Sequence, residues 1–236
     1  MKKSKDETIL LFDIDGTLMR SVNTLHIESF QRSIRRHFNI DASRDTMNIA
    51  GMFDRQIIVE MLALNGIEID YLDPGIDNLC REIGTYYVEQ SRKTKNQVKL
   101  LSGVTELLTA IKSRGIVAGL VTGNIEAVAW EKIRISGLES LIMPFGGFGD
   151  ERVTTRGQLI PSALRKAEKH TGLRFHPSRA VIIGDTPRDI NAAREAGSRV
   201  ITVCGTYNRE DLEACHPDLI LNSLEEIDLF MSFING

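Results

Sequence analysis

The chain has 236 residues, of which 42% are hydrophobic and 26% charged, a composition that is typical of a globular protein and excludes a disordered or fibrous one. The formal net charge is −3, so the composition gives no reason to expect nucleic-acid binding. The three cysteines form no CxxC pair, which argues against a zinc ribbon or a disulfide framework. No apolar run approaches the ~18 residues of a membrane span. We therefore expect a soluble, cytoplasmic protein without nucleic-acid or membrane partners, either a monomer or a weak homodimer.

Short apolar runs bounded by turn residues recur along the chain, and each is typical of a strand buried on both faces of a parallel sheet. They lie at residues 9–12, 115–121, 180–183 and 199–203, with a weaker run at 219–221. Helical patterns lie between them, at residues 104–113, 127–135, 161–170 and 189–196. Strands that alternate with helices predict βαβ units, and hence an α/β fold with a parallel sheet.

The stretch from Met19 to Gln97 breaks this alternation. It contains no convincing buried strand and shows three helical patterns, at residues 25–37, 52–65 and 76–91. The polar, basic segment 91–97 is its predicted return linker. We therefore expect a core made of residues 1–18 and 98–236, with a helical insertion over residues 19–97 directly after the first strand.

Polar residues follow the predicted strands at the point where each strand ends. They are Asp13, Asp15, Thr122, Asn124, Asp185 and Asp189. Any single Asp among them is equally compatible with a turn or a helix cap. In an open parallel sheet, however, ligands bind beyond the carboxyl ends of the strands, so we expect these side chains to converge. Carboxylates at one edge repel unless a cation neutralises them, and Mg²⁺ with its oxygen ligands suits this place.

In combination, these motifs resemble those of the haloacid-dehalogenase-like (HAD) hydrolase superfamily. Residues 13–18 match its first motif, DxDGT, residues 121–124 its second, and residues 184–189 its fourth, GDxxxD. The insertion lies where members with a helical (C1-type) cap carry it, as in the phosphoglycolate phosphatase and β-phosphoglucomutase branch. The resemblance implies an α/β fold with a Rossmann-like doubly wound parallel sheet core and an inserted helical cap domain.

The resemblance also implies roles for the first two motifs. Asp13 is expected to be the nucleophile that forms an aspartyl-phosphate, and Asp15 the general acid for the leaving oxygen and then the base for water. Two residues along an extended strand place both side chains on one face. The Thr122 hydroxyl is expected to bind a phosphoryl oxygen, together with Gly123 and Asn124.

The resemblance further implies a Mg²⁺ site. The expected ligands are the Asp13 carboxylate, the Asp15 backbone carbonyl and Asp185. Asp189 is expected to take part through a hydrogen bond or a water molecule. Such an ion offsets the repulsion between a phosphate and the nucleophilic carboxylate.

The third motif departs from the family pattern. Gln158 stands where many helical-cap members have a Lys, and the family needs a cation there. The candidates are Arg152, Arg156, Arg165 and Lys166. We predict Arg156, because it lies in the loop before the helix that is predicted from Pro161.

Two cap residues are candidates for substrate contact: His26, and Arg55 at the end of the segment 51–55. Arg55 could pair with a carboxylate or a second phosphate of the substrate. The alternatives are that His26 simply lies on a helix face and that Arg55 caps a helix or faces solvent.

The function implied is a Mg²⁺-dependent phosphatase that acts on a small phosphorylated metabolite. Asp15 favours this over a dehalogenase, since a halide leaving group needs no proton and a phosphate ester does. The alternatives are a phosphomutase of the β-phosphoglucomutase type, or a regulatory HAD module of low activity, which the missing motif-three Lys would favour.

Overall fold

The computed structural model describes residues 7–42, 47, 49–94 and 98–236. Its larger part is a six-stranded sheet with the order β5-β4-β1-β6-β7-β8, in which every neighbouring pair is parallel. The strands are β1 (Ile9–Phe12), β4 (Val117–Val121), β5 (Gly146–Gly147), β6 (Ala180–Gly184), β7 (Arg199–Val203) and β8 (Leu219–Leu221). The first strand of the chain lies between β4 and β6, so the strand order reverses at β1. Residues that follow β1 therefore lie at the switch point where α/β sheets bind ligands.

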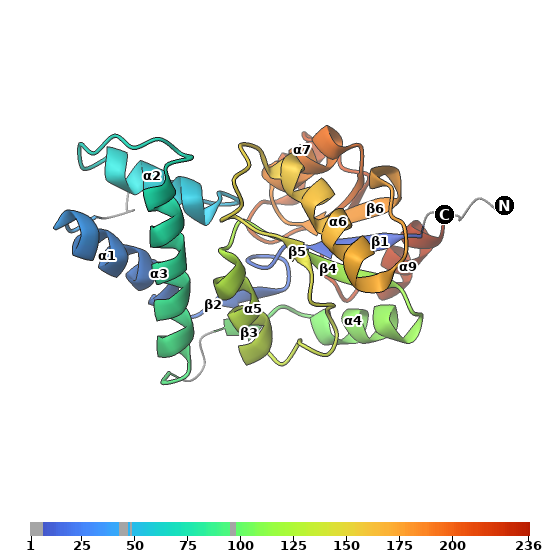
Figure 1. The fold of residues 1–236 in the computed structure, drawn as a ribbon. Helices are drawn as coiled ribbons and strands as arrows, with labels where there is room; N and C mark the ends of the chain where they lie inside the picture. The colour runs from blue at the N-terminus through green and yellow to red at the C-terminus, as the bar shows by residue number, and fades with distance from the viewer. Residues whose placement is uncertain (1–6, 43–46, 48, 95–97) are drawn as a thin grey trace.

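Helices cover both faces of this sheet (Figure 1). They are α4 (Val104–Ser113), α5 (Glu126–Ile135), α6 (Leu159–Thr171), α7 (Pro187–Ala196), α8 (Arg209–Glu213) and α9 (Ile227–Asn235). Because successive strand residues point to opposite faces, Leu10 and Phe12 pack in the core with α4, α5 and α9. Ile9 and Leu11 pack in the other core, with α6, α7 and α8. The predicted doubly wound parallel sheet is confirmed.

Three further helices lie together to one side of the sheet: α1 (Leu25–Phe38), α2 (Asp54–Ala63) and α3 (Pro74–Ser91) (Figure 1). They share a hydrophobic core of their own, which includes Phe30, Met61 and Ile83. Ile125 and Val128, at the beginning of α5, belong to the same core. We refer to the described part of residues 19–97 as the cap. α5 thus packs against the cap as well as the sheet.

A short antiparallel ribbon joins the cap to the rest of the chain. It consists of β2 (Met19–Ser21) and β3 (Val98–Leu100), with Met19 opposite Leu100. The sequence predicted no convincing buried strand in residues 19–97, and β2 is a short strand of which Arg20 and Ser21 are exposed. A three-residue strand is too short to give an apolar run, and its partner lies at the far end of the insertion. The predicted linker over residues 91–97 lies partly outside the described residues, and the division between residues 18 and 19 and between residues 97 and 98 stays a prediction.

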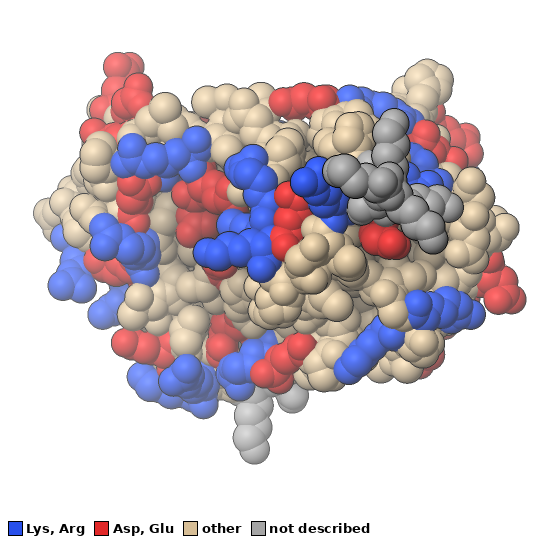
Figure 2. Space-filling model, turned by 45° about the vertical axis from the view of Figure 1, so that its right-hand side comes forward, with Lys and Arg blue, Asp and Glu red and all other residues tan. Residues whose placement is uncertain are grey.

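The surface carries charges of both signs. Figure 2 shows Lys and Arg interspersed with Asp and Glu over one face of the molecule, in line with the net charge of −3. Among the helices of the described ranges, none combines the length and the apolar character needed to cross a membrane.

Candidate active site

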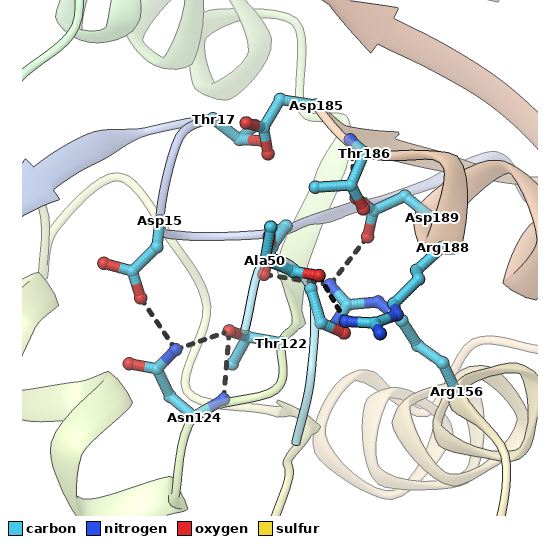
Figure 3. Close-up of polar contacts among 12 residues, drawn as sticks. Asp15, Thr17, Ala50, Thr122, Asn124, Arg156, Asp185, Thr186, Arg188 and Asp189 are labelled. Atoms are coloured by element: carbon cyan, nitrogen blue, oxygen red, sulfur yellow. Dashed lines mark hydrogen bonds and ion pairs between the residues drawn. The ribbon is translucent and has the colours of Figure 1, made fainter. Parts of the chain in front are cut away.

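Three carboxylates meet beyond the carboxyl ends of β1 and β6. Asp13 directly follows β1, and its backbone N–H donates to the carbonyl of Ile183 at 2.8 Å. Carboxylate oxygens of Asp13, Asp185 and Asp189 lie within 4.8 Å of one another, and all three residues are buried. Figure 3 shows Asp185 and Asp189 on the same side of the site, at the end of β6 and the beginning of α7. The structure thus brings together the acidic residues that the sheet topology predicts.

Arg156 is the cation at this cluster. It lies in a 3₁₀ turn (Arg156–Gln158) just before α6, and its Nη2 is 3.1 Å from Asp13 Oδ1 and 2.6 Å from Asp189 Oδ1. Its Nη1 donates to the carbonyl of Gly51 in the cap at 3.4 Å. Arg156 therefore contacts the predicted nucleophile and the cap at the same time.

The other candidates for the motif-three cation lie elsewhere. Arg152 pairs with Asp77 of the cap, and Lys166 pairs with Glu151 at 2.9 Å. Arg165 is exposed on α6. Among the described residues, Arg156 is the one cation that forms ion pairs within the cluster, and it pairs with Asp13 and Asp189.

The cluster carries more negative charge than Arg156 neutralises. Burial raises the pKa of Asp13 to about 7; the Arg156 guanidinium opposes this, and the neighbouring carboxylates add to it. Burial also raises the pKa of Asp185 to about 6, and the charge of Asp189 adds to it. Three buried carboxylate oxygens that face one another are the ligands that a hard divalent cation prefers. The residues present therefore fit such an ion.

The DGT sequence turns the chain away from β1 and leaves room for Asp185. Gly16 has a φ of +85°, and a Cβ at this position would lie 2.1 Å from Asp185 Oδ2. Only glycine adopts this conformation readily and fits the space. The hydroxyl of Thr17 then donates to Asp185 Oδ1 at 3.3 Å. The first and fourth motifs thus fit together through a contact that a larger residue at position 16 would prevent.

The Asp15 carboxylate has different partners from Asp13. Lys132 Nζ lies 2.9 and 2.7 Å from its two oxygens, and the Asn124 side-chain amide donates to Oδ2 at 2.8 Å. In Figure 3, Asp15 faces Asn124 and lies well apart from Asp185. Burial alone would raise the pKa of Asp15, but the Lys132 ammonium and the hydrogen bond from Asn124 hold it below its ordinary value. The side chain keeps 40% of its surface exposed.

The turn after β4 adjoins both the site and the cap. The buried hydroxyl of Thr122 accepts from the backbone N–H of Asn124 at 3.3 Å and from its side-chain amide at 3.2 Å. A Cβ on Gly123 would lie 2.1 Å from the carbonyl oxygen of Met52. The Asp54 N–H donates to the carbonyl of Gly123 at 2.8 Å. The predicted phosphate-binding turn therefore lies directly against the cap.

A cavity of about 600 Å³ lies between the cap and the carboxyl edge of the sheet. From the core, Asp13, Asp15 and Arg156 line it, and from the cap, His26 and Met52. Its further walls are both polar and apolar, and include Arg20, Asn23, Ile27, Phe30, Ile57, Gly123, Asn124 and Thr186. The acidic cluster thus opens into a space large enough for a small organic molecule.

The model of the family "Haloacid dehalogenase-like hydrolase" matches residues 10–203. The chain belongs to this family. The chain is 25% identical over 231 residues to "Pyrophosphatase PpaX" of Bacillus mycoides, covering 96% of this chain and 98% of that protein. It is 24% identical to "Phosphoglycolate phosphatase" of Nitrosococcus oceani, covering 97% and 98% of the two chains. β-Phosphoglucomutase from Clostridium difficile has a similar fold, with a TM-score of 0.68 at 18% identity and 98% of each chain covered. The predictions of a HAD-type enzyme and of its fold are confirmed.

In this HAD hydrolase, Arg55 has a different place from the one predicted. It does not line the cavity and is fully buried within the cap. Its guanidinium donates to the carbonyl of Tyr71 at 2.6 Å and to that of Asp73 at 3.4 Å, and it pairs with Asp77. Arg55 therefore joins the ends of two cap helices, because a buried guanidinium must find several acceptors. His26, in contrast, lines the cavity, and its contact with a substrate stays a prediction.

Lys132 is the functional candidate of this HAD hydrolase that the sequence analysis missed. It is fully buried on α5 and contacts Asp15, Asn124 and His26. A signal was present, because Lys132 lies one helical turn after Val128 and so on the apolar face of the predicted helix. A charged residue on such a face needs a buried partner, and Asp15 is that partner.

Proposed function

We propose that this HAD hydrolase is a Mg²⁺-dependent phosphatase that releases inorganic phosphate from a small phosphorylated metabolite. The proposal depends on one observation: Asp13 and Asp15 both line the cavity, and each is paired with its own cation. Asp13 is paired with Arg156 and Asp15 with Lys132. The names of the relatives, pyrophosphatase and phosphoglycolate phosphatase, support it. A cytoplasmic location and a monomeric or weakly dimeric state stay predictions from the sequence.

In the first proposed step, a carboxylate oxygen of Asp13 attacks the phosphorus and the ester P–O bond breaks. The leaving oxygen takes its proton from Asp15, and an aspartyl-phosphate remains on Asp13. A covalent intermediate of this kind divides one difficult displacement into two easier ones. Asp15 must be protonated for this step, and the negative charge of a bound phosphoryl group would raise its pKa toward that state.

In the second proposed step, Asp15, now a carboxylate, takes a proton from water as the water oxygen attacks the phosphorus. The bond between phosphorus and Asp13 breaks, phosphate leaves, and Asp13 is a free carboxylate again. Arg156 holds Asp13 throughout and would offset charge on the phosphoryl oxygens. The Thr122 hydroxyl and the backbone N–H groups of Gly123 and Asn124 are the proposed donors to these oxygens.

The proposed metal ligands are the carboxylates of Asp13, Asp185 and Asp189 and the backbone carbonyl of Asp15. The three buried carboxylates and the raised pKa values of Asp13 and Asp185 support this choice. When bound, Mg²⁺ would weaken the repulsion between the phosphate and the attacking carboxylate.

The alternative of a regulatory module rested on the missing motif-three Lys. Arg156 offers a positive charge at 3.1 Å from Asp13 Oδ1, and a guanidinium can do the same electrostatic work as an ammonium. The missing Lys is therefore no longer an argument for a regulatory module without catalytic turnover.

The proposal is tested by phosphate release from an aryl phosphate, with Mg²⁺ or with EDTA, in the wild type and in Asp13→Asn. We expect release that needs Mg²⁺ and is abolished by the substitution, while the exposed control Asp211→Asn behaves as the wild type. A panel of metabolite phosphates then identifies the natural ester. If no ester in the panel releases phosphate, the proposal is wrong. Sugar-phosphate isomerisation activated by a bisphosphate would favour the phosphomutase alternative instead.

A further inference from the structure

A partly buried polar cluster joins the cap to Asp15. Its members are Asp15, Asn124 and Lys132 of the core and His26 and Asp54 of the cap, and we call it the Lys132 cluster. Lys132 Nζ lies 2.7 Å from Asp15 Oδ2, 2.7 Å from Asn124 Oδ1 and 3.4 Å from His26 Nδ1. The Lys132 side chain has no exposed surface. An ammonium has three protons to donate, and here each has an acceptor.

The partners of His26 determine how its ring is protonated. Lys132 Nζ can only donate, so His26 Nδ1 must accept and carries no proton. The proton is then on Nε2, which donates to Asp54 Oδ2 at 3.0 Å. Asp54 Oδ2 also accepts from the backbone N–H of Ile125 in the core at 2.8 Å. A continuous series of hydrogen bonds therefore passes from the core through two cap helices and back to the carboxylate of Asp15.

This arrangement fixes the orientation of Asp15. Lys132 contacts both carboxylate oxygens and Asn124 contacts one of them, while the exposed part of the side chain faces the cavity. Removing the cap would take away His26 Nδ1, which is one of the four acceptor atoms around a fully buried ammonium, and losing a partner of a buried charge is costly. The position of Lys132, and with it that of Asp15, should therefore depend on the docked cap.

We propose that Lys132 is a positioning residue that holds the Asp15 carboxylate against the leaving group, and that His26 and Asp54 make this positioning depend on the docked cap. The inference rests on the proposed phosphatase function and deepens it. It assigns no contact with substrate to Lys132. Positioned groups of this kind contribute through orientation, so a small misplacement of Asp15 would slow proton transfer strongly.

The decisive readout is the dependence of rate on the leaving group. An ester of an acidic alcohol, such as 2,4-dinitrophenyl phosphate, needs no proton donor, whereas propyl phosphate does. For Lys132→Met we expect kcat/KM on propyl phosphate, which reports the first step alone, to fall by roughly 10²-fold or more, with kcat/KM on the dinitrophenyl ester little changed. The comparison uses kcat/KM because Asp15 also takes the proton from water in the second step, which is common to both esters and contributes to kcat. A merely structural Lys132 would lower both rates alike, and that result would overturn the proposal.

Two further variants sharpen the comparison. His26→Gln should lower the rate on propyl phosphate relative to the dinitrophenyl ester by a smaller factor than Lys132→Met, since Asp15 keeps its contact with Lys132. If Lys132→Met does not fold, His26→Gln is the variant that tests the proposal. Lys166→Met is the matched control, because Lys166 of α6 pairs with Glu151 and its loss should leave the leaving-group dependence unchanged. A wild-type pattern in both Lys132→Met and His26→Gln would contradict the proposal.

A second measurement does not depend on activity. Nitrogen NMR of the His26 ring, assigned with His26→Gln, should show the neutral Nε2–H form in the wild type and loss of the acceptor shift at Nδ1 in Lys132→Met. A proton on Nδ1 in the wild type would overturn the cluster. If the wild type hydrolyses no ester, the proposed function is wrong, but the NMR result still tests the cluster. If the variants are active and show the same leaving-group dependence as the wild type, the inference about Lys132 is wrong and the proposed function stands.

Discussion

Asp13 and Asp15 lie two residues apart but have separate cations. Arg156 Nη2 lies 3.1 Å from Asp13, and Lys132 Nζ lies 2.7 Å from Asp15. The pKa of Asp13 is raised to about 7 by burial in spite of Arg156, whereas that of Asp15 is lowered, because Lys132 and its neighbours outweigh burial. These directions are the reverse of the protonation states that the first proposed step needs, so a bound divalent cation would have to lower the pKa of Asp13 and a bound phosphoryl group would have to raise that of Asp15.

The raised pKa values predict how the stability of the metal-free protein depends on pH. Asp13 and Asp185 titrate near pH 7 and 6 in the folded state but have an ordinary value of 3.8. Between about pH 4 and 7 the folded state therefore binds more protons than the unfolded state, so these groups stabilise it at low pH and this stability is lost as the pH rises. We expect the Tm in EDTA to fall over this range, and Mg²⁺ to recover part of the loss near pH 8.

The control for this prediction is Asp185→Asn, which removes one of the two groups. Its Tm in EDTA should fall less steeply between pH 4 and 7, and Mg²⁺ should raise it less. Asp15 does not disturb the comparison, because the stability that comes with its lowered pKa is lost only as the pH falls below the ordinary value of 3.8. Equal slopes for the two proteins would contradict the assignment of the raised pKa to Asp185.

Arg156→Ala should abolish most phosphate release without loss of metal binding. The guanidinium contacts Asp13 and Asp189, and loss of a charge-stabilising donor at such a site typically lowers kcat by about 10²- to 10³-fold. Steady-state phosphate release measures the first effect, and calorimetric titration with Mg²⁺ measures the second. Arg165→Ala is the matched control, since Arg165 is exposed on the following helix. Full activity in Arg156→Ala would show that another group supplies the cation.

The sequence was sufficient to predict the acidic cluster because parallel topology dictates it. Each apolar run had to be a strand buried on both faces, and the carboxyl ends of such strands share one edge. Asp13 and Asp185 therefore had to meet. Arg156 followed from its place just before a predicted helix, in the loop that reaches the same edge.

The Lys132 cluster could not be predicted in this way. Lys132 and Asp15 are 117 positions apart, and the helical pattern places Lys132 on an apolar face without showing which carboxylate lies opposite it. The same holds for Arg55, whose charge suggested a substrate contact. Its partners Tyr71 and Asp77 are set by the packing of cap helices. Contacts that follow from strand order were predictable, and contacts that follow from the packing of helices were not.

Gly16→Ala should damage the metal site more than it damages the fold. A left-handed φ costs a residue with a side chain about 1–2 kcal/mol, and here the new Cβ would also lie 2.1 Å from Asp185 Oδ2. Asp185 must then move. We expect a higher Mg²⁺ concentration for half-maximal activity, together with a modest loss in the free energy of unfolding measured in urea.

Gly172→Ala separates the two effects. Gly172 has a φ of +72° with nothing within 4 Å of an added Cβ, so it shares the backbone cost and lacks the clash. The free energy of unfolding of Gly172→Ala should fall by about as much as the backbone strain lowers it in Gly16→Ala, and the Mg²⁺ concentration needed for activity should stay unchanged. If Gly16→Ala and Gly172→Ala need the same Mg²⁺ concentration, Asp185 does not depend on the glycine.

Arg55→Met should destabilise the protein while leaving catalysis by the folded molecules intact. Arg55 is fully buried and donates to the carbonyls of Tyr71 and Asp73 besides pairing with Asp77, and each buried acceptor left without its partner costs about 1–3 kcal/mol. Arg152 pairs with the same Asp77 from a half-exposed position, where a pair contributes at most about 1 kcal/mol. Urea unfolding of Arg55→Met and Arg152→Met should therefore differ by a few kcal/mol. Since Arg55 does not line the cavity, KM should stay unchanged; a raised KM with full stability would instead restore Arg55 as a substrate contact.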